Sequence, residues 1–380
     1  MVTYGPAKPQ ERGEILDFAN LVFSMAHRPH DFAAMLPKVY GEGAPLFQPD
    51  KHFIAREDGR IRALVAMLPV PARAAGRGFT VGFIGTVSTH PYYRGRGGMK
   101  HLMAMAMDTA RREGYAYMAL GGRRQRYGYF GFTPAGVSAS HLINGDNVRH
   151  ALGGIDSSRI SFKEITDSND PLIDIAYGAY DRQIAAGSRS RENFLIICQS
   201  WGAKLYAVND GGACVGYAVA TNDDMVSELV LEDSARYAKP FFKAWYAARG
   251  GFKLRVPTFD IPLQQEAESI SEGFAIDQEC KLRVLDWETT LGAALALKRA
   301  AQPMPDGRWT IQIDGGEPLT MEVAGADTSV SRSGRDIDAS MTSMQAQEAV
   351  FSMKSLLFPV SNAPQGWFPL ALGRRSADDF

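Results

Sequence analysis

Two stretches of the chain follow the same order of predicted elements, and this repetition narrows the folds that the chain can adopt. In both, a hairpin precedes a strand, a helix and another strand. The hairpins turn at Asp58-Gly59 and at Asp210-Gly211, dipeptides typical of tight β-turns. Because a repeated order of strands and helices indicates duplicated α/β units, the 380-residue chain is predicted to hold two such units followed by a third.

Local patterns set the expected bounds of these elements. The first stretch predicts an amphipathic helix over 10–27, strands over 52–56, 61–70, 82–88 and 115–120, and a helix over 99–110 that ends at Gly114. The second predicts strands over 205–210, 214–220, 226–231 and 252–256 and a helix over 235–248. From about residue 281 a smaller α+β unit is expected, with helices over 287–299 and 344–357 and a hairpin joining 308–313 to 319–323.

A glycine-rich run, Arg94-Gly-Arg-Gly-Gly98, stands between the strand that ends at Val87-Ser88-Thr89 and the following helix. Glycine lets the backbone approach a ligand and adopt positive φ. The first N–H groups of a helix are unpaired and the helix dipole is positive there. Arg94, Arg96 and Lys100 add positive charge. The run therefore predicts an anion-binding loop of the kind that holds phosphate groups.

Other phosphate loops fit this run poorly. A Walker A loop needs Gly-x4-Gly-Lys-Ser/Thr, and a dinucleotide fingerprint needs glycine where Lys100 stands. A solvated turn and a fragment of an RNA-binding RGG segment remain alternative interpretations. The matching segment of the second stretch, 232–238, has no glycine, so its loop is predicted to be lost.

Composition argues against several classes of protein. With 45% hydrophobic and 22% charged residues the chain is typical of folded globular proteins. A net charge of -1 argues against nucleic acid or an anionic membrane as the general partner. The three cysteines form no CxxC or Cys/His cluster, so neither disulfides nor a metal are expected. Without a signal segment or an apolar run of membrane length, a cytoplasmic protein is expected.

The residues around the glycine loop resemble the GCN5-related N-acetyltransferase (GNAT) superfamily, whose loop reads Arg/Gln-x-x-Gly-x-Gly/Ala. Arg94 and Gly97 match this motif, and Met99 departs from its last position. That departure, the run over 122–135 and the chain length are similar to the Eis (enhanced intracellular survival) branch. The specific motifs lie in 87–134 and at Phe380, whereas the layout resembles the branch over the whole chain.

This resemblance implies an α/β (α+β) fold with three domains. A catalytic GNAT domain would span 1–140, a degenerate GNAT-like domain 141–282, and a sterol-carrier-protein-2-like domain 283–380. Both GNAT domains would have a mixed sheet flanked by helices. A homohexamer is also implied.

The cofactor implied by the resemblance is acetyl-CoA, with no metal. The strand would pair with the pantetheine amides, the loop would meet the pyrophosphate, and the Gly122-Arg123 segment would lie alongside. The cofactor residues implied in this way are Val87, Ser88, Thr89, Arg94, Gly95, Arg96, Gly97, Gly98, Met99, Lys100, Gly122 and Arg123.

Two catalytic residues are also implied by the resemblance. Tyr127 matches the tyrosine that acts as general acid toward the leaving thiolate. Phe380 matches the family's terminal residue, whose α-carboxylate acts as general base. From the residues alone, Tyr127 could instead pack in a core with Tyr129, Phe130 and Phe132, and the last residues could be a frayed acidic tail.

Candidate acceptor residues are Phe23, His30 and Asp31 in the N-terminal segment and Asp379 near the end of the chain. Acidic residues at this end would favour a cationic substrate. The expected activity is direct acetyl transfer from acetyl-CoA to primary amines of a cationic small molecule, similar to an aminoglycoside or a polyamine. The alternatives are acetylation of protein or peptide lysines and a non-catalytic protein that binds CoA or lipid.

Overall fold

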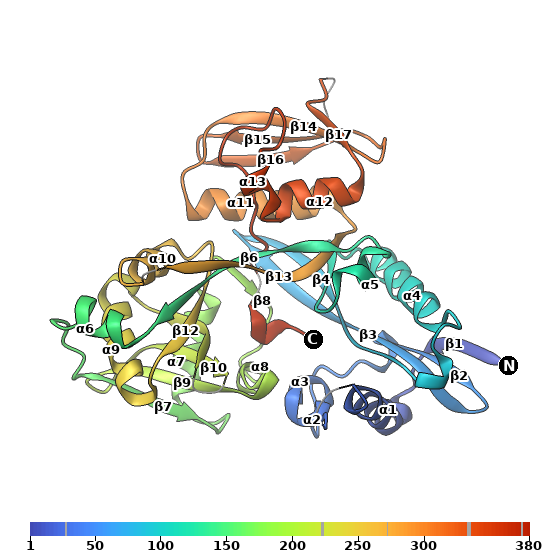
Figure 1. Ribbon diagram of the computed structural model, residues 1–380, viewed down its shortest axis with the longest axis horizontal. Helices are drawn as coiled ribbons and strands as arrows, with labels where there is room; N and C mark the ends of the chain where they lie inside the picture. The colour runs from blue at the N-terminus through green and yellow to red at the C-terminus, as the bar shows by residue number, and fades with distance from the viewer. Residues whose placement is uncertain (27–28, 222–223, 272, 333–335, 374) are drawn as a thin grey trace.

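The structure is a computed structural model of the chain (Figure 1). It describes residues 1–26, 29–221, 224–271, 273–332, 336–373 and 375–380. Within these residues the strands form two sheets, one of 13 strands and one of four, with helices packed on them. The mixed α/β class, with sheets flanked by helices, is thereby confirmed. The expected first helix reaches residue 27, which lies outside the described residues.

The first half of the large sheet contains the predicted hairpin and the strands that follow it. β2 pairs antiparallel with β3, β3 antiparallel with β4, and β4 parallel with β5. Asp58 and Gly59 have φ values of 52° and 72°, as a tight turn between β2 and β3 requires. The elements are β1 (Val2–Pro6), α1 (Arg12–Ser24), α2 (Phe32–Met35), α3 (Pro37–Tyr40), β2 (His52–Glu57), β3 (Arg60–Ala74), β4 (Arg77–Thr89), α4 (Gly98–Arg112), β5 (Tyr117–Leu120) and α5 (Arg124–Gly128).

Helices α1 and α4 cover opposite faces of this half. Alternate side chains of β3 therefore belong to two different hydrophobic cores, one under each helix. Leu64, Ala66 and Leu68 belong to one buried cluster with the apolar face of α1. Val65 and Met67 belong to another with α4. Successive strand residues point to opposite faces, so this strand is buried on both sides.

The second half has the same order and direction of strands. β9 pairs antiparallel with β10, β10 antiparallel with β11, and β11 parallel with β12, with α9 between the last two. Trp245 of α9 is fully buried, with Phe241 and Phe252 beside it. The elements are α6 (Gly145–Ala151), β7 (Ile160–Ile165), α7 (Leu172–Asp181), β8 (Ala185–Gly187), α8 (Phe194–Cys198), β9 (Ala203–Asp210), β10 (Ala213–Thr221), β11 (Met225–Leu231), α9 (Ser234–Arg249), β12 (Phe252–Pro257) and α10 (Ile261–Glu268).

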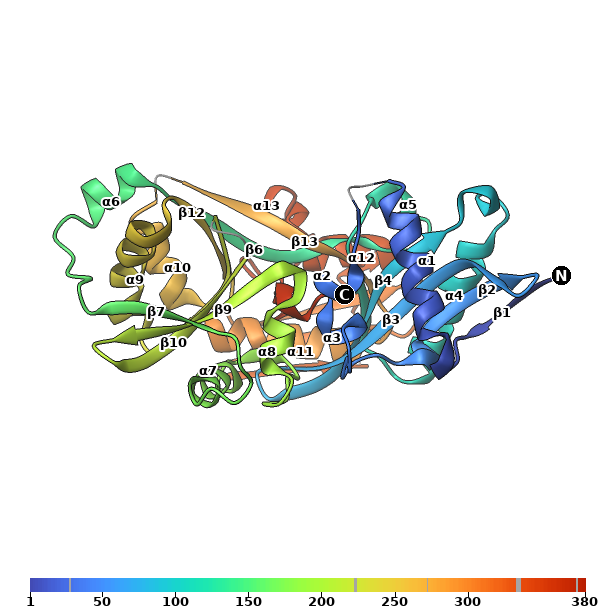
Figure 2. The same cartoon turned by 90° about the horizontal axis from the view of Figure 1, so that it is seen from below.

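Two long strands that the sequence patterns did not predict join the halves into one sheet. β6 (Thr133–Ile143) pairs with β12 and with β13 (Phe274–Val284), and β13 also pairs with β5. Both strands run across the middle of the molecule in Figures 1 and 2. The domain boundaries at 140/141 and 282/283 stay predictions.

The C-terminal unit packs on this central region. Its elements are α11 (Trp287–Ala301), β14 (Gly307–Ile313), β15 (Leu319–Ala324), β16 (Asp327–Ser331), β17 (Ala339–Met341), α12 (Ser343–Phe351) and α13 (Lys354–Leu357). The β14–β15 hairpin confirms the prediction. A single helix over 344–357 is wrong, because Ser352 is extended and its hydroxyl accepts the Lys354 N–H, which starts a new turn. No described helix has both the length and the apolarity of a membrane span.

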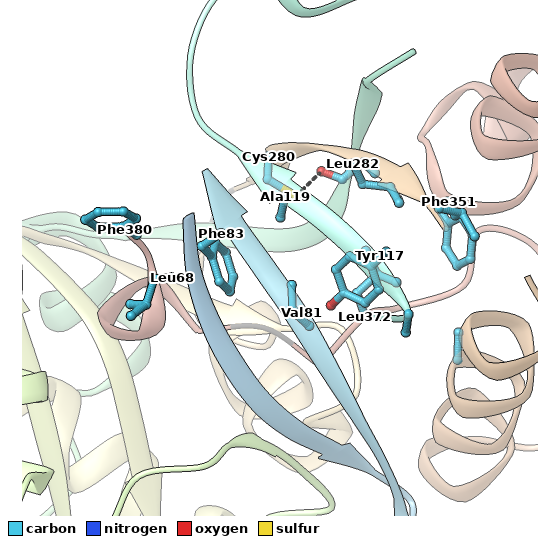
Figure 3. Close-up of a cluster of buried hydrophobic side chains, with 14 of the residues drawn as sticks. Leu68, Val81, Phe83, Tyr117, Ala119, Cys280, Leu282, Phe351, Leu372 and Phe380 are labelled. Atoms are coloured by element: carbon cyan, nitrogen blue, oxygen red, sulfur yellow. Dashed lines mark hydrogen bonds between the residues drawn. The ribbon is translucent and has the colours of Figure 1, made fainter. Parts of the chain in front are cut away.

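The last residues leave this unit and return to the large sheet. Trp367, Leu370 and Phe380 are buried in the same cluster as the α1 face of β3. In both views the C-terminus lies between the two halves, near α8 and α3 (Figures 1 and 2). Figure 3 shows the Phe380 ring on the Leu68 and Phe83 side of this cluster. The tail thus connects the C-terminal unit to both halves.

Candidate active site

Strand β4 parts from β5 halfway along its length. The parallel pairing covers Val81 to Ile84 only, whereas β4 continues to Thr89 beside β3. The β3–β4 register shifts between Leu64 and Ala66, and Thr86 opposite has a φ of 45°, a β-bulge that bends the strand. Among the described residues, the Val87–Thr89 segment therefore has strand pairing on its β3 side alone.

The glycine loop lies beyond the end of β4. Gly95 and Gly97 have φ values of 80° and 81°, and a Cβ on either would meet nothing within 4 Å. These glycines are needed for their backbone conformation. Gly97 is also the N-cap of α4, where it has no side chain to cap the first turn. The N-terminus of a 15-residue helix is thus open toward an anion.

The cations of this loop are arranged around aromatic rings. The Arg96 guanidinium lies 4.4 Å from the Tyr93 ring centroid and 4.0 Å from the Glu57 carboxylate. Lys100 lies 4.2 Å from the Tyr129 ring centroid and donates a hydrogen bond to its hydroxyl. Arg94 is exposed. Contacts with Tyr93, Glu57 and Tyr129 thus hold Arg96 and Lys100 on either side of the first residue of α4, where an anion would be attracted.

Tyr127 lies in α5, which follows β5 after a short loop. It is buried on the α4 side of the sheet, and its ring occupies the space beside Gly122, where a Cβ would come within 2.7 Å. Burial raises the pKa of Tyr127, although the nearby Arg126 opposes the shift. Tyr129, by contrast, is 68% exposed, so it does not share the core formed around Phe132. Gly122 and Arg123 are exposed next to Tyr127.

Phe380 brings the end of the chain to the bulge of β4. Its carboxyl carbon is 2.9 Å from the place where a Cβ on Gly85 would stand, and its ring is 2.7 Å from that place. The ring centroid lies 6.0 Å from that of Tyr40 and 6.4 Å from that of His52. Phe380 is 8% exposed. The missing side chain of Gly85 is what leaves room for the terminal residue.

A buried hydrogen-bond chain, which the sequence did not reveal, supports the bulge. His52 Nδ1 lies 2.7 Å from the Gln48 carbonyl, which can only accept, so Nε2 accepts from the Tyr40 hydroxyl at 3.0 Å. Tyr40 in turn accepts from the Thr86 hydroxyl at 2.9 Å. Burial lowers the pKa of His52 to about 4 and raises that of Tyr40. Both groups are therefore neutral at physiological pH and hold Thr86 in its unusual conformation.

The proposed acceptor residues are two aromatic side chains, Phe23 and His30, and two carboxylates, Asp31 and Asp379. Phe23 and His30 form one aromatic cluster with Phe32, with ring centroids 4.8 to 5.1 Å apart, and Phe32 connects it to Tyr40 at 5.9 Å. Asp31 is exposed and caps α2 by accepting the backbone N–H groups of residues 33 and 34. Asp379 is half-buried in the tail beside Phe380.

Sequence reasoning also missed the buried charges that surround the tail. Lys38, Arg189, Glu228 and Arg375 are all 3% exposed or less. Burial lowers the pKa of Lys38 to about 8, against the opposing effect of Asp378 and Asp379. These charged residues are far apart in the sequence and belong to no motif, so no local signal could have grouped them.

We expect His52 to make stability depend on pH. Its folded pKa of about 4 is below the ordinary 6.5, so the unfolded chain binds the proton first as pH falls. The stabilisation is complete above pH 6.5 and is lost towards pH 4, a change on the order of 3 kcal/mol. Urea denaturation of wild type and His52→Gln should show a shallower decline for the variant. Parallel declines would contradict the assignment.

Residues 3–135 match the acetyltransferase (GNAT) domain family. A GCN5-related N-acetyltransferase from Anabaena variabilis has a similar structure, with a TM-score of 0.68 and 14% identity over 97% of this chain and 95% of that one. Eis1 from Mycobacterium abscessus gives a TM-score of 0.63 and 16% identity, with both chains covered over 100% of their length.

A probable N-acyltransferase from Enterococcus faecalis gives a TM-score of 0.63 and 13% identity, covering 91% of this chain and 88% of that one. A search among curated proteins finds no significant match. At these identities the likeness to the solved structures concerns the fold, whereas the family match concerns the domain that holds the loop, the bulge and Tyr127. Residues 3–135 therefore form an acetyltransferase domain of the GNAT family, and the fold of the whole chain is similar to that of Eis1.

Proposed function

We propose that the protein transfers the acetyl group of acetyl-CoA directly to a primary amine of a cationic small molecule, of the aminoglycoside or polyamine type. One contact carries this proposal. The carboxyl carbon of Phe380 lies against Gly85, one residue before the bulge of β4, 2.9 Å from where a Cβ would stand. We call the place where β4 leaves β5, after Ile84, the β4–β5 fork. A carboxylate at this position can remove a proton from an amine that approaches the end of the fork.

The cofactor side of the proposal rests on the fork and the loop. Acetyl-CoA would supply the acetyl group, and CoA would leave as its thiolate when the thioester bond breaks. Val87, Ser88 and Thr89 offer backbone groups on the open side of β4. The first turn of α4, the loop from Arg94 to Met99, and Lys100 offer N–H donors and positive charge for phosphates. Gly122 and Arg123 are exposed beside them.

Tyr127 is proposed as the general acid. Burial raises its pKa, so the phenol keeps its proton at neutral pH and can give it to the departing thiolate. The Phe380 carboxylate and Tyr127 would then act at the two ends of the same reaction, one removing a proton and the other returning one. The aromatic cluster of Phe23, His30 and Phe32 would form a wall of the acceptor site, with Asp31 and Asp379 adding negative charge.

Direct transfer is favoured by the state of the three cysteines. Burial raises the pKa of Cys198 to about 12 and also raises that of Cys214. Cys280 is buried next to the Ala135 carbonyl in the middle of the sheet. An acyl-enzyme needs a reactive thiolate, and none of these environments favours one. The sterol-carrier-protein-2-like assignment of the C-terminal unit, the homohexamer and the cytoplasmic location stay predictions.

The two catalytic assignments predict the same kinetic signature. Tyr127→Phe should lower kcat by about 10²-fold or more, because the ring still packs but no proton is delivered. One residue appended after Phe380 should have a comparable effect, since the carboxylate moves away. Thiol-release kinetics and calorimetric binding of acetyl-CoA test this, and affinity for acetyl-CoA should change little.

The controls are Tyr177→Phe, which alters a half-buried tyrosine of the second half, and an extension at the N-terminus. Intact mass should confirm that the purified chain ends at Phe380. Full activity of the extended chain would remove Phe380 from the mechanism, and full activity of Tyr127→Phe would remove the tyrosine.

Gly85→Ala tests the position of the terminal residue by filling its space. The added methyl would stand 2.7 Å from the Phe380 ring and 2.9 Å from its carboxyl carbon, so the tail must shift. A displacement of about 1 Å is expected to lower kcat by up to 10²-fold. Gly78→Ala is the matched control, because it lies in the same strand with nothing within 4 Å of its Cβ position. Equal activity of both variants would contradict the proposed site.

The acceptor class is tested by profiling amines with the thiol-release assay. Di- and polyamines and aminoglycosides should be acetylated with higher kcat/KM than neutral monoamines of similar size, because the site combines carboxylates with aromatic rings. Lysine-containing peptides are the comparison set. Acetylation of the peptides alone would assign the enzyme to protein substrates instead.

A further inference from the structure

The end of the chain is fixed by buried charged groups. The Asp378 carboxylate accepts a hydrogen bond from Arg189 Nε at 2.7 Å, with side chains 6% and 0% exposed. The carbonyl of Ala377 accepts from Lys38 Nζ at 2.6 Å, and Lys38 is 1% exposed. We call Lys38, Arg189 and Glu228 the tail receptor.

Arg189 is itself held in one orientation. Its two terminal nitrogens donate to the two oxygens of Glu228 at 3.2 and 3.1 Å, and its guanidinium lies 4.2 Å from the Tyr180 ring centroid. Glu228 also accepts a hydrogen bond from the Tyr217 hydroxyl. Because a bidentate pair and a stacked ring fix the guanidinium, the Nε donor of Arg189 points at Asp378.

The backbone on the other side of Asp378 makes room for it. A Cβ on Gly187 would come within 3.0 Å of the Asp378 carboxylate. Gly187 ends β8, which pairs with β3 of the first half. Arg375 precedes the short 3-10 turn Ser376–Asp378. It donates to Gln183 at 3.0 Å and lies 3.9 Å from Glu228. Residues from both halves therefore contact successive residues of the tail.

Burying several charged side chains together adds little net stability to a fold. Removing ions from water costs several kcal/mol for each, and apolar side chains of the same volume often give equal or better stability. What ion pairs with several hydrogen bonds do supply is a fixed position and direction. Phe380 is two residues beyond Asp378, a span of at most about 7 Å, so fixing Asp378 also limits where the terminal carboxylate can lie.

We propose that Arg189 and Lys38 are positioning residues, and that the tail receptor, built mainly by the second half of the chain, holds the Phe380 carboxylate at Gly85. The effect on catalysis rests on the proposed function, whereas the docking of the tail does not. The second half thereby has a role in the enzyme although its segment 232–238 has no glycine loop.

The docking is tested by carboxypeptidase A, which removes a C-terminal aromatic residue only when it is accessible. Wild-type protein should resist release of Phe380, and Asp378→Ala and Lys38→Met should release it at least tenfold faster, as measured by intact mass. Asp378→Ala leaves the buried Arg189 paired with Glu228, and Lys38→Met keeps the length of the buried side chain, so both variants are expected to fold. Asp174→Ala is the matched control, because it breaks an exposed ion pair with Arg191 in the same half.

The effect on catalysis is tested by a double-mutant cycle with a chain that lacks Phe380. Asp378→Ala and the deletion should each lower kcat by about 10²-fold while leaving acetyl-CoA affinity unchanged. Combining them should cause no further loss, because both act through the same carboxylate. Additive losses would indicate a merely structural role and overturn the positioning role.

The two proposals fail in different ways. Equal release of Phe380 from wild type and from both variants would overturn the tail receptor and leave the proposed function standing. Faster release from the variants, together with full activity of the chain that lacks Phe380, would overturn the catalytic base and the positioning role, while the docked tail would stand.

Discussion

Arg189 and Asp378 are 189 residues apart in the sequence, yet their side chains meet at 2.7 Å in the interior. A deeply buried ion pair depends on further hydrogen bonds to its members. Among the described residues Asp378 Oδ2 has none, whereas Glu228 fixes Arg189 through two. The tail therefore has one well-defined path between the halves. The position of Phe380 against Gly85, and with it the composition of the candidate active site, depends on this contact.

The other fixed part of the site is the bulge of β4. A strand that continued straight would keep pairing with β5 and leave no room for a ligand between them. Thr86 instead adopts a φ of 45°, and the chain from Thr86 through Tyr40 and His52 to the Gln48 carbonyl holds it there. Because this chain ends at a carbonyl, which has no proton to pass on, it is suited to support and not to proton relay.

Local sequence signals predicted much of the first half. The Asp58-Gly59 turn and the glycine loop before α4 depend on residues adjacent in the chain, so their patterns were sufficient. The β6 and β13 strands were missed because their register is set by each other and by β5 and β12, all distant in sequence. The tail receptor was not predicted for the same reason, because nothing in the local sequence distinguishes a buried lysine or arginine from a solvated one.

The two halves also differ at one helix terminus, and this difference bears on where we propose that phosphate binds. In the first half the N-cap of α4 is Gly97, which leaves the N–H groups of the first turn open. In the second half the N-cap of α9 is Asp233, whose carboxylate accepts the Arg236 N–H. A carboxylate at a helix N-terminus occupies the place that a phosphate would take and already balances the helix dipole. The same sheet topology therefore has an open helix N-terminus, the proposed phosphate site, in one half and an internally capped helix in the other, where Arg189, held by Glu228, contacts the end of the chain.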